Sequence, residues 1–391
     1  MTVNRATFAE INLDSFRHNL HSIKSLMGPG VGTMAIIKAD AYGHGAIQCA
    51  RVATKEQVNY IGVGIIQEGI ELRESGITSP ILILGGIYPN EIGDLIKYNL
   101  STSLSNSVIA SAISKKAEQA NKSVGVHIKI DTGMGRLGIQ PEGFMSLLNN
   151  VRSYKNLKIE GVFTHLSSAD EEDSAKTNHQ ISIFSNVLKK LHTTNISKMN
   201  NVNDHILSHS ANTAGLLRFP ESRFDLVRPG ISLFGSFPSP ATASAFDVLA
   251  KENKLTKLRP VMNWKTKIIQ VQTLRKGVPV SYGGRYVTKN DETRIATIPV
   301  GYADGLSRRL SGNMELLVKE TRVKQVGTIC MDMCLIDITN LPDATMGEEV
   351  VIFGTQGKGQ IKVEELATQA DTIPYEILCG VGKRVPRIYI S

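Results

Sequence analysis

Between residues 12 and 235, short apolar runs alternate with amphipathic stretches of ten or more residues. A short apolar run bounded by turn residues is typical of a buried strand, and a longer stretch with helical spacing is typical of a surface helix. Their alternation predicts repeated β-α units. We expect strands at 33–38, 61–66, 80–85, 126–131, 159–164, 206–209 and 226–234, a helix with Asp14 as its N-cap, and further helices at 44–55, 67–75, 90–97, 106–120, 142–152 and 173–193.

Seven or eight such units fit a (β/α)8 barrel better than an open sheet. A chain of 391 residues also exceeds what one core usually supports, so a second domain is expected. After about residue 245 the chain changes to β-branched runs without intervening helices. We therefore predict an α/β fold with a barrel over 12–245 and a mostly-β domain over 246–391.

Charge and cysteine content exclude several classes of protein. The net charge of +8 is spread along the chain without a dense basic run, which indicates a solvated surface and no nucleic-acid partner. No apolar stretch is long enough for a signal peptide or a membrane span, so we expect a cytoplasmic protein without a membrane partner. Four scattered cysteines predict neither a disulfide scaffold nor a metal site, and Cys330 and Cys334 are expected to be buried free thiols.

One lysine stands at the end of a predicted buried strand. The segment 38–45 reads Lys-Ala-Asp-Ala-Tyr-Gly-His-Gly and follows the apolar run 33–37. Burial lowers the pKa of a lysine amine and frees its lone pair, which a Schiff-base lysine requires. Spacing alone leaves open a solvated lysine at a strand end. The placement nevertheless makes Lys38 a candidate for amine chemistry.

The segment 38–45 resembles the cofactor-lysine signature of alanine racemases, the pyridoxal-phosphate enzymes that interconvert L- and D-alanine. The resemblance covers nearly the whole chain and includes several motifs in the same order. It implies that the strand-like segment within residues 1–11 joins the sheet of the C-terminal domain. The other motifs are 129–138, 164–165, 209–213, 227–231, 280–283, 301–305, 327–332 and 373–375.

The resemblance implies two catalytic bases. Racemisation removes a proton from one face of a planar intermediate and delivers one to the other face, so two groups must flank the cofactor. Lys38, which holds pyridoxal phosphate covalently, is one base, and Tyr282 from the partner subunit is the other. His165 and Arg228 would stabilise the Tyr282 anion, and Arg228 would face the pyridine nitrogen and leave it unprotonated. Taken alone, His165 fits a core histidine better than a catalytic one, and Tyr282 fits an ordinary hairpin aromatic better.

The phosphate of the cofactor would be held by residues near the ends of the last barrel strands. By resemblance these are the backbone of Gly230 and Ile231, the hydroxyl of Thr213, and the phenols of Tyr42 and Tyr375. Thr213 stands where serine is common in the family and keeps the hydroxyl. Taken singly, the glycine reads as a turn residue and the tyrosines as packing residues.

Substrate recognition is implied at two further places. Lys129, as a carbamylated lysine, would hold Arg136 through a charge-assisted pair, and Arg136 would bind the substrate carboxylate. Two solvated cations are the alternative. Met331 and Asp332 of the partner would approach the same carboxylate, and Tyr302 would line the entry. These roles require a head-to-tail homodimer with shared sites.

The predicted activity is therefore alanine racemisation, which supplies D-alanine for peptidoglycan. A broad-specificity or serine racemase shares most of these motifs and stays open. An amino-acid decarboxylase would place a carboxylate at the pyridine nitrogen and use a catalytic cysteine, whereas this chain has Arg228 and Tyr282. A non-catalytic pyridoxal-phosphate carrier would consist of the barrel alone.

Overall fold

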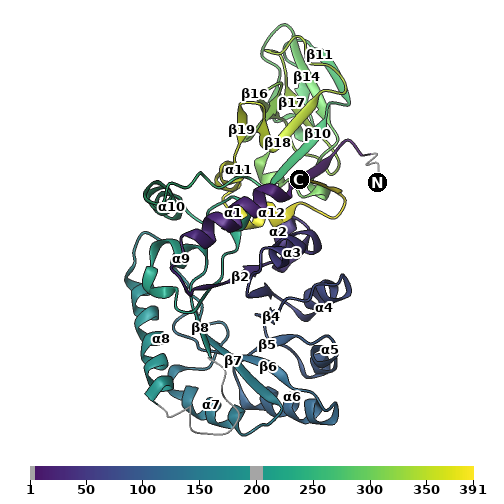
Figure 1. Cartoon of the computed structure of the whole chain (residues 1–391). Coiled ribbons are helices and arrows are strands. Elements are labelled where there is room, and N and C mark those ends of the chain that lie inside the picture. The colour runs from purple at the N-terminus through teal and green to yellow at the C-terminus, as the bar shows by residue number, and fades with distance from the viewer. Residues whose placement is uncertain (1–4, 194–205) are drawn as a thin grey trace.

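The computed structural model describes residues 5–193 and 206–391 of the chain, which form a helix-rich lobe and a β-rich lobe (Figure 1). The first four residues of the predicted N-terminal segment 1–11 lie outside this description. None of the helices in these ranges combines the length and apolar character that a membrane crossing requires.

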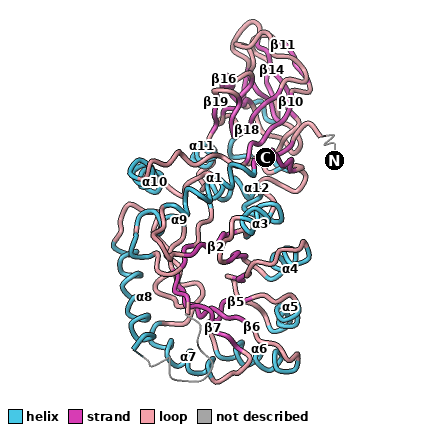
Figure 2. Tube along the Cα trace, in the orientation of Figure 1, coloured by secondary structure: helices cyan, strands magenta, loops and turns pink. Residues whose placement is uncertain are grey.

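The helix-rich lobe is a barrel of eight parallel strands in the order β8-β7-β6-β5-β4-β3-β2-β9 within the described residues. The strands lie inside the ring of helices (Figure 2). Most of their residues are buried, which explains the apolar runs of most of these strands. The predicted fold class is confirmed. The strands are β2 (Gly32–Ile36), β3 (Tyr60–Val63), β4 (Ile81–Ile83), β5 (Ser101–Leu104), β6 (Val124–Lys129), β7 (Leu157–Phe163), β8 (Leu207–His209) and β9 (Leu226–Val227).

Helices cover the outside of the barrel, and the predicted ones begin within a few residues of their predicted positions. The helices over 213–218 and 240–252 were not predicted. The prediction of Asp14 as an N-cap is wrong. Asn12 caps the first helix, because its Oδ1 accepts a hydrogen bond from the Ser15 N–H at 2.7 Å, and Asp14 lies in the first turn. The helices are α1 (Leu13–Ser25), α3 (Ala46–Lys55), α4 (Ile66–Glu74), α5 (Ile92–Lys97), α6 (Ser107–Gln119), α7 (Phe144–Arg152), α8 (Ala175–Thr193), α9 (Thr213–Arg218) and α10 (Pro240–Glu252).

Two barrel strands differ from the sequence prediction. The strand β5 was not expected, because its sequence Ser-Thr-Ser-Leu lacks an apolar run, yet its hydroxyls are bonded within the barrel. The predicted strand 226–234 is wrong beyond Val227. Pro229 has no N–H for a strand ladder, and the chain instead forms the 3₁₀ turn η5 (Ile231–Phe234).

The β-rich lobe contains a sheet of ten strands among the described residues, in the path β11-β14-β17-β16-β15-β18-β10-β1-β20 with β19 paired to β18. β1 (Phe8–Asn12) pairs with β10 and β20, so the start and the end of the chain meet there. The others are β10 (Met262–Lys267), β11 (Gln270–Leu274), β14 (Thr293–Ile298), β15 (Glu315–Val318), β16 (Thr321–Val326), β17 (Cys334–Asp337), β18 (Glu349–Gln356), β19 (Gly359–Ile361) and β20 (Arg387–Ile390).

Smaller elements complete this lobe. The strands β12 (Pro279–Val280) and β13 (Tyr286–Val287) form a hairpin around the turn η6 (Tyr282–Gly284). The expectation of no intervening helices is wrong, because the described residues of this lobe also form α11 (Val363–Gln369) and α12 (Pro374–Gly380). Cys334 is buried as expected, whereas Cys330 is only half-buried and lies outside a strand. The predicted division between 245 and 246 falls inside α10 and stays a prediction.

Candidate active site

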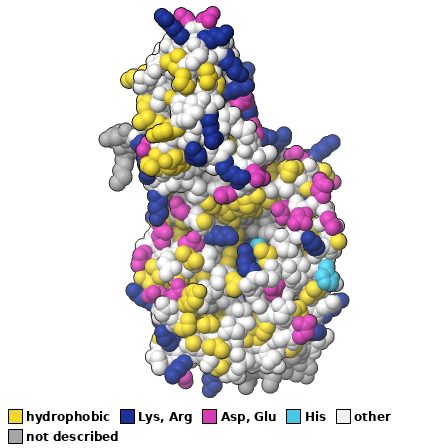
Figure 3. Space-filling model, turned by 180° about the vertical axis from the view of Figure 1, so that it is seen from behind, with side chains coloured by type: hydrophobic (Ala, Val, Ile, Leu, Met, Phe, Trp, Pro, Cys, Tyr) yellow, Lys and Arg dark blue, Asp and Glu magenta, His cyan; other side chains and the backbone are white. Residues whose placement is uncertain are grey.

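The residues that the sequence singled out in the barrel gather at the carboxyl ends of its strands. Because parallel strands end at the same rim, residues far apart in sequence meet there. Lys38 follows β2, Lys129 ends β6, His165 follows β7, and Arg228 follows β9. Figure 3 shows a hollow beneath the β-rich lobe, with hydrophobic side chains above and Lys or Arg side chains and a histidine below.

The prediction that Lys38 ends the strand is wrong. Lys38 opens α2 (Lys38–Gly43), a left-handed turn. The strand β2 stops at Ile36. The φ angles of Ala39, Asp40, Ala41 and Tyr42 are 53°, 52°, 54° and 54°. A left-handed conformation costs an L-residue roughly 1–2 kcal/mol. Four in succession require strong support from the surroundings.

The amine of Lys38 lies in an electrostatic setting suited to a nucleophile. Burial lowers its pKa, Arg136 lowers it further, and Glu68 raises it in part. Nothing in the local sequence pattern indicated a role for Glu68. Its Oε1 accepts a hydrogen bond from the Ala39 N–H at 2.6 Å, and its Oε2 accepts one from the Gly64 N–H at 2.7 Å. Glu68 thus ties the start of the left-handed turn to the neighbouring strand β3.

Arg228 is buried and donates to four neutral acceptors. They are His209 Nδ1 at 2.8 Å, Thr164 O at 2.8 Å, Ser210 O at 2.9 Å and His165 Nδ1 at 3.3 Å. Burial lowers the pKa of the guanidinium to about 9, so it stays charged at neutral pH. A guanidinium only donates, so these bonds fix the protonation of the groups that face it.

Two histidines that carried no predicted role continue this network. Because His209 Nδ1 accepts from Arg228, its Nε2 carries the hydrogen and donates to His127 Nδ1 at 2.9 Å. Burial lowers the pKa of His127 to about 3 and that of His209 well below its ordinary value, so both rings are neutral. His127 Nε2 then carries a hydrogen and lies 3.8 Å from Glu160 Oε2. Each hydrogen bond of this network is therefore donated in the same direction, from Arg228 to His209 and from His209 to His127 in the barrel core.

Arg228 also determines which ring nitrogen of His165 carries the hydrogen. Its Nδ1 accepts from Arg228 Nη2, so the hydrogen of the neutral ring is on Nε2. Burial first, and then the charge of Arg228, lower the pKa of His165 well below its ordinary value. A neutral imidazole with its Nε2–H at the barrel rim can donate to an oxygen anion.

Lys129 and Arg136 lie on either side of a tight turn. Burial and the nearby Arg136 lower the pKa of Lys129 to about 8. Asp131 Oδ1 accepts hydrogen bonds from the N–H groups of Gly133, Met134 and Gly135 at 3.0, 2.9 and 3.1 Å. This turn delivers the Arg136 side chain to the exposed rim. Asp131 lies within the family motif 129–138 but carried no predicted role.

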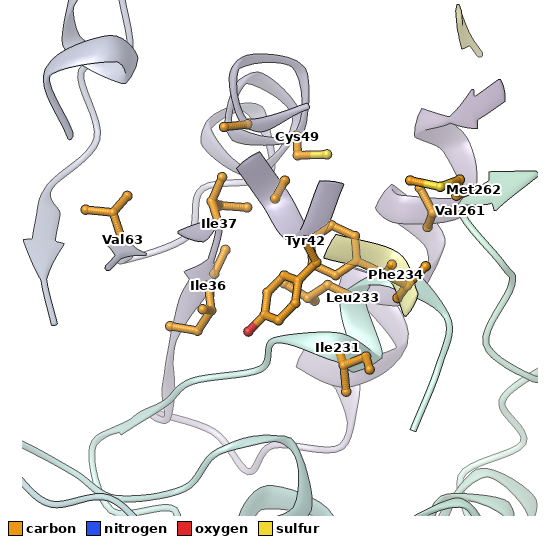
Figure 4. Packing of buried hydrophobic residues seen from close by; sticks show 14 of the residues in the cluster. Ile36, Ile37, Tyr42, Cys49, Val63, Ile231, Leu233, Phe234, Val261 and Met262 are labelled. Carbon is orange, nitrogen blue, oxygen red and sulfur yellow. The ribbon is translucent and has the colours of Figure 1, made fainter. Parts of the chain in front are cut away.

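The predicted phosphate residues form a cradle between α2 and η5. Thr213 Oγ1 accepts the Gly230 N–H at 3.0 Å, and a Cβ on Gly230 would lie 2.5 Å from Tyr42 Oη. Only glycine leaves room there. The rings of Tyr42 and Tyr375 are 5.7 Å apart. Burial raises the pKa of both phenols, so they stay protonated donors. Figure 4 shows the Tyr42 ring packed beside Leu233 and Phe234, with its oxygen toward the segment that carries Ile231. Donors in a cradle that a Cβ would fill fit the phosphate of pyridoxal phosphate.

The remaining predicted residues gather on loops of the β-rich lobe. Thr328 Oγ1 donates to Tyr282 O at 2.9 Å, and the Tyr302 N–H donates to Cys330 O at 3.0 Å. Tyr282, Tyr302 and Met331 are 72%, 43% and 53% exposed. Asp332 accepts from Arg384 Nη2 at 2.7 Å. Exposed aromatic and methionine side chains grouped on one surface are typical of an interaction site.

A parallel barrel with a lysine, two arginines and an oriented histidine network at its carboxyl rim, followed by a β domain, defines a two-domain barrel enzyme. The model of the alanine racemase N-terminal domain matches residues 11–238, and that of the C-terminal domain matches residues 261–389. The chain therefore belongs to the alanine racemase family and is an isomerase, EC 5.1.1.1.

Individual relatives agree over the whole length. An alanine racemase from Halothermothrix orenii is 40% identical over 387 residues, which are 99% of this chain and 97% of that protein. The structure of an alanine racemase from Clostridium difficile 630 matches with a TM-score of 0.89 and 36% identity, covering 100% of this chain and 97% of that one. An alanine racemase from Bacillus anthracis, solved with bound L-Ala-P, matches with a TM-score of 0.88 and 32% identity, covering 100% and 96%.

Proposed function

We propose that this chain interconverts L-alanine and D-alanine with pyridoxal phosphate held covalently by Lys38. The observation that carries the proposal is the setting of Lys38. Its amine, with a lowered pKa, stands at the barrel rim beside Arg136 and at the opening of the turn that also carries Tyr42. The turn thus supplies both an amine for the aldehyde and a donor for the phosphate.

When bound, pyridoxal phosphate supplies an electron sink for the negative charge that develops at Cα of the amino acid. Lys38 moves a proton on one face, and Tyr282 of a second subunit moves one on the other face. A phenol has a pKa near 10, so its anion needs stabilisation near neutral pH. The Nε2–H of His165 supplies a donor to the phenolate oxygen, and the charge of Arg228 lies behind that ring.

Arg228 also has a role toward the cofactor ring. Because the guanidinium presents only donors, a pyridine nitrogen that faces it accepts a hydrogen bond and carries no proton. An unprotonated ring is the weaker electron sink, which limits side reactions such as transamination. Replacement of Arg228 by glutamate should therefore raise the ratio of transamination to racemisation, and an unchanged ratio would contradict this role.

Arg136 binds the substrate carboxylate, and Lys129 positions Arg136. An amine with a pKa of about 8 is partly neutral near physiological pH, so Lys129 can add to carbon dioxide and release a proton to give a carbamate anion. The Lys129 ammonium is repelled by the nearby charges of Arg136 and Arg228, whereas a carbamate at the same place would attract both guanidinium groups. Tyr302, Met331 and Asp332 of the second subunit complete the entry to the site.

The direct test is to incubate the cofactor-loaded protein separately with L-alanine, L-serine and L-lysine and to measure both enantiomers and carbon dioxide. D-alanine should form fastest and without gas release. The Lys38→Ala variant is the control for non-enzymatic racemisation. Faster inversion of serine or lysine would indicate a broader racemase, gas release a decarboxylase, and no conversion a carrier.

Shared sites can be tested by mixing two inactive variants. Lys38→Ala lacks the first base and Tyr282→Phe lacks the second. If Tyr282 acts across the dimer, random reassembly of equal amounts restores one complete site in half of the dimers, or about a quarter of the original activity. No recovery after reassembly would show that both bases come from the same chain.

The biological role proposed is the supply of D-alanine for peptidoglycan. Expression of the chain should allow a bacterium that lacks its own alanine racemase to grow without added D-alanine, and the Lys38→Ala variant should not. The cytoplasmic location expected from the sequence stays a prediction.

A further inference from the structure

The left-handed turn that begins at Lys38 is closed at its far end by His44. The ring of His44 is fully buried. Its Nδ1 lies 2.9 Å from Ala41 O and 3.0 Å from Tyr42 O. Carbonyl oxygens only accept, so Nδ1 carries the hydrogen and donates to both. These two carbonyls belong to residues that hold positive φ angles.

The tautomer has a cost at the other ring nitrogen. With the hydrogen on Nδ1, Nε2 is a buried acceptor, and it has no hydrogen-bond partner within the described residues. A phenyl ring would fill this space without an unpaired acceptor. What the imidazole contributes here beyond apolar packing is therefore the Nδ1–H, which donates to the Ala41 and Tyr42 carbonyls.

Packing on a shared ring, Phe234, fixes the His44 imidazole relative to Tyr42 of the phosphate cradle. His44 stacks on Phe234 with ring centroids 4.4 Å apart, and Tyr42 packs on the same Phe234 at 5.0 Å. Phe234 ends η5, which begins directly after Gly230. Burial lowers the pKa of His44 to about 4, so the neutral ring and its bonds persist across the neutral pH range.

We propose that His44 is a positioning residue whose Nδ1–H holds the left-handed turn closed and so fixes where Lys38 Nζ and Tyr42 Oη point. Two side chains bond the strained backbone. Glu68 accepts a hydrogen bond from the Ala39 N–H at its start, and His44 donates to the Ala41 and Tyr42 carbonyls at its end. Without the bonds from His44, residues 39–42 relax toward ordinary φ angles, and the Lys38 amine and the Tyr42 phenol lose their relative placement. The inference rests on the proposed function only in that Lys38 carries the cofactor.

The test uses three variants of the full chain. His44→Phe keeps a ring against Phe234 and removes the donor. His44→Asn places an amide N–H near the position of Nδ1, whereas His44→Gln places one near Nε2. For each variant the dissociation constant of pyridoxal phosphate is measured, together with the yield of cofactor trapped on Lys38 by borohydride, which mass spectrometry locates. Thermal denaturation without cofactor reports stability separately.

We expect His44→Phe to bind the cofactor about tenfold more weakly, the equivalent of one neutral hydrogen bond shared between two carbonyls, with little change in thermal stability. His44→Asn should recover most of the binding and of the trapping at Lys38, and His44→Gln should not. Equal trapping in His44→Phe and the original chain would overturn the proposal, and so would equal behaviour of the Asn and Gln variants. If His44→Phe does not fold, the comparison of Asn with Gln decides.

The trapping measurement separates this inference from the proposed function. It reports the attachment of pyridoxal phosphate to Lys38 and does not require turnover of any amino acid. A chain that binds the cofactor through Lys38 but racemises nothing would refute the proposed function and leave the role of His44 testable. A chain in which the cofactor attaches to another lysine would refute the proposal for His44.

Discussion

Replacing His209 with phenylalanine should destabilise the barrel by roughly 2–5 kcal/mol. Phenylalanine preserves the stacking of this ring on Phe163, whose centroid is 4.7 Å away at an angle of 6°. It removes the acceptor for Arg228 Nη1 and the donor for His127 Nδ1, so two buried groups lose their partners. Each unpaired buried group costs about 1–3 kcal/mol, and more when it is charged.

The double variant His209→Phe, His127→Phe makes a sharper prediction. It removes both partners of the bond between the histidines and leaves only the Arg228 donor unpaired. Because replacing both partners costs less than orphaning one, the double variant should be more stable than His209→Phe alone by about 1–3 kcal/mol. A matched surface control is His179→Phe, since His179 is exposed on α8.

The assay is urea unfolding followed by two signals. Far-ultraviolet circular dichroism reports mainly the barrel, which contains most of the helices. Fluorescence reports the β domain, because the single tryptophan, Trp264, lies buried in β10. The circular-dichroism midpoint should fall in His209→Phe and rise again in the double variant. An unchanged midpoint in His209→Phe, or a further fall in the double variant, would refute the directed network.

Three further predictions follow from the site. Lys129 has a folded pKa of about 8 against an ordinary 10.5, so the unfolded chain binds more protons between these values and stability from this group rises with pH across that window. In carbon-dioxide-free buffer, Lys129→Met should therefore be more stable than the original chain at pH 7 by up to roughly 3 kcal/mol, with the difference vanishing toward pH 10.5 in urea titrations. Gly230→Ala should weaken pyridoxal-phosphate binding about tenfold or more by pressing on Tyr42 Oη, and Gly93→Ala, where a Cβ meets nothing within 4 Å, should have no effect in the same titration. Asp131→Ala should raise KM for alanine about tenfold with a smaller change in kcat, because the turn that carries Arg136 loses three backbone bonds; an unchanged KM would show that the turn holds its shape without them.

Most of the barrel could be predicted from local pattern. Strands that are buried on both faces are mainly apolar, so β2, β3 and β4 are visible as short apolar runs, whereas the apolar residues of β6 and β7 are interrupted by polar ones. The strand β5 was not predicted, because its polar side chains make their hydrogen bonds with residues distant in sequence. Ser101 Oγ donates to Glu160 Oε2 at 2.7 Å across 59 positions. No local rule could identify that partner.

The placement of the site residues was partly predictable for the same reason. Parallel strands end at one rim, so Lys38 and His165, which the sequence placed at strand ends, were expected to meet there. Lys129 and Arg228 were expected inside strands, and they join the rim because those strands end earlier than predicted. Their detailed roles still depend on the family resemblance, which spacing alone did not supply. Whether Tyr282 completes the site of a partner chain stays a prediction.

The sequence by itself indicated most of the barrel strands and helices, the positions of Lys38 and His165 near strand ends, and the motifs that the chain shares with its family, because each of these is written in the local sequence. Only the tertiary structure decided how those residues are held. The left-handed turn at Lys38 depends on Glu68, and the tautomers of His209 and His127 depend on Arg228. A hydrogen bond between residues 82 positions apart leaves no trace in local pattern, because the direction of a donor is fixed by the group that faces it in space.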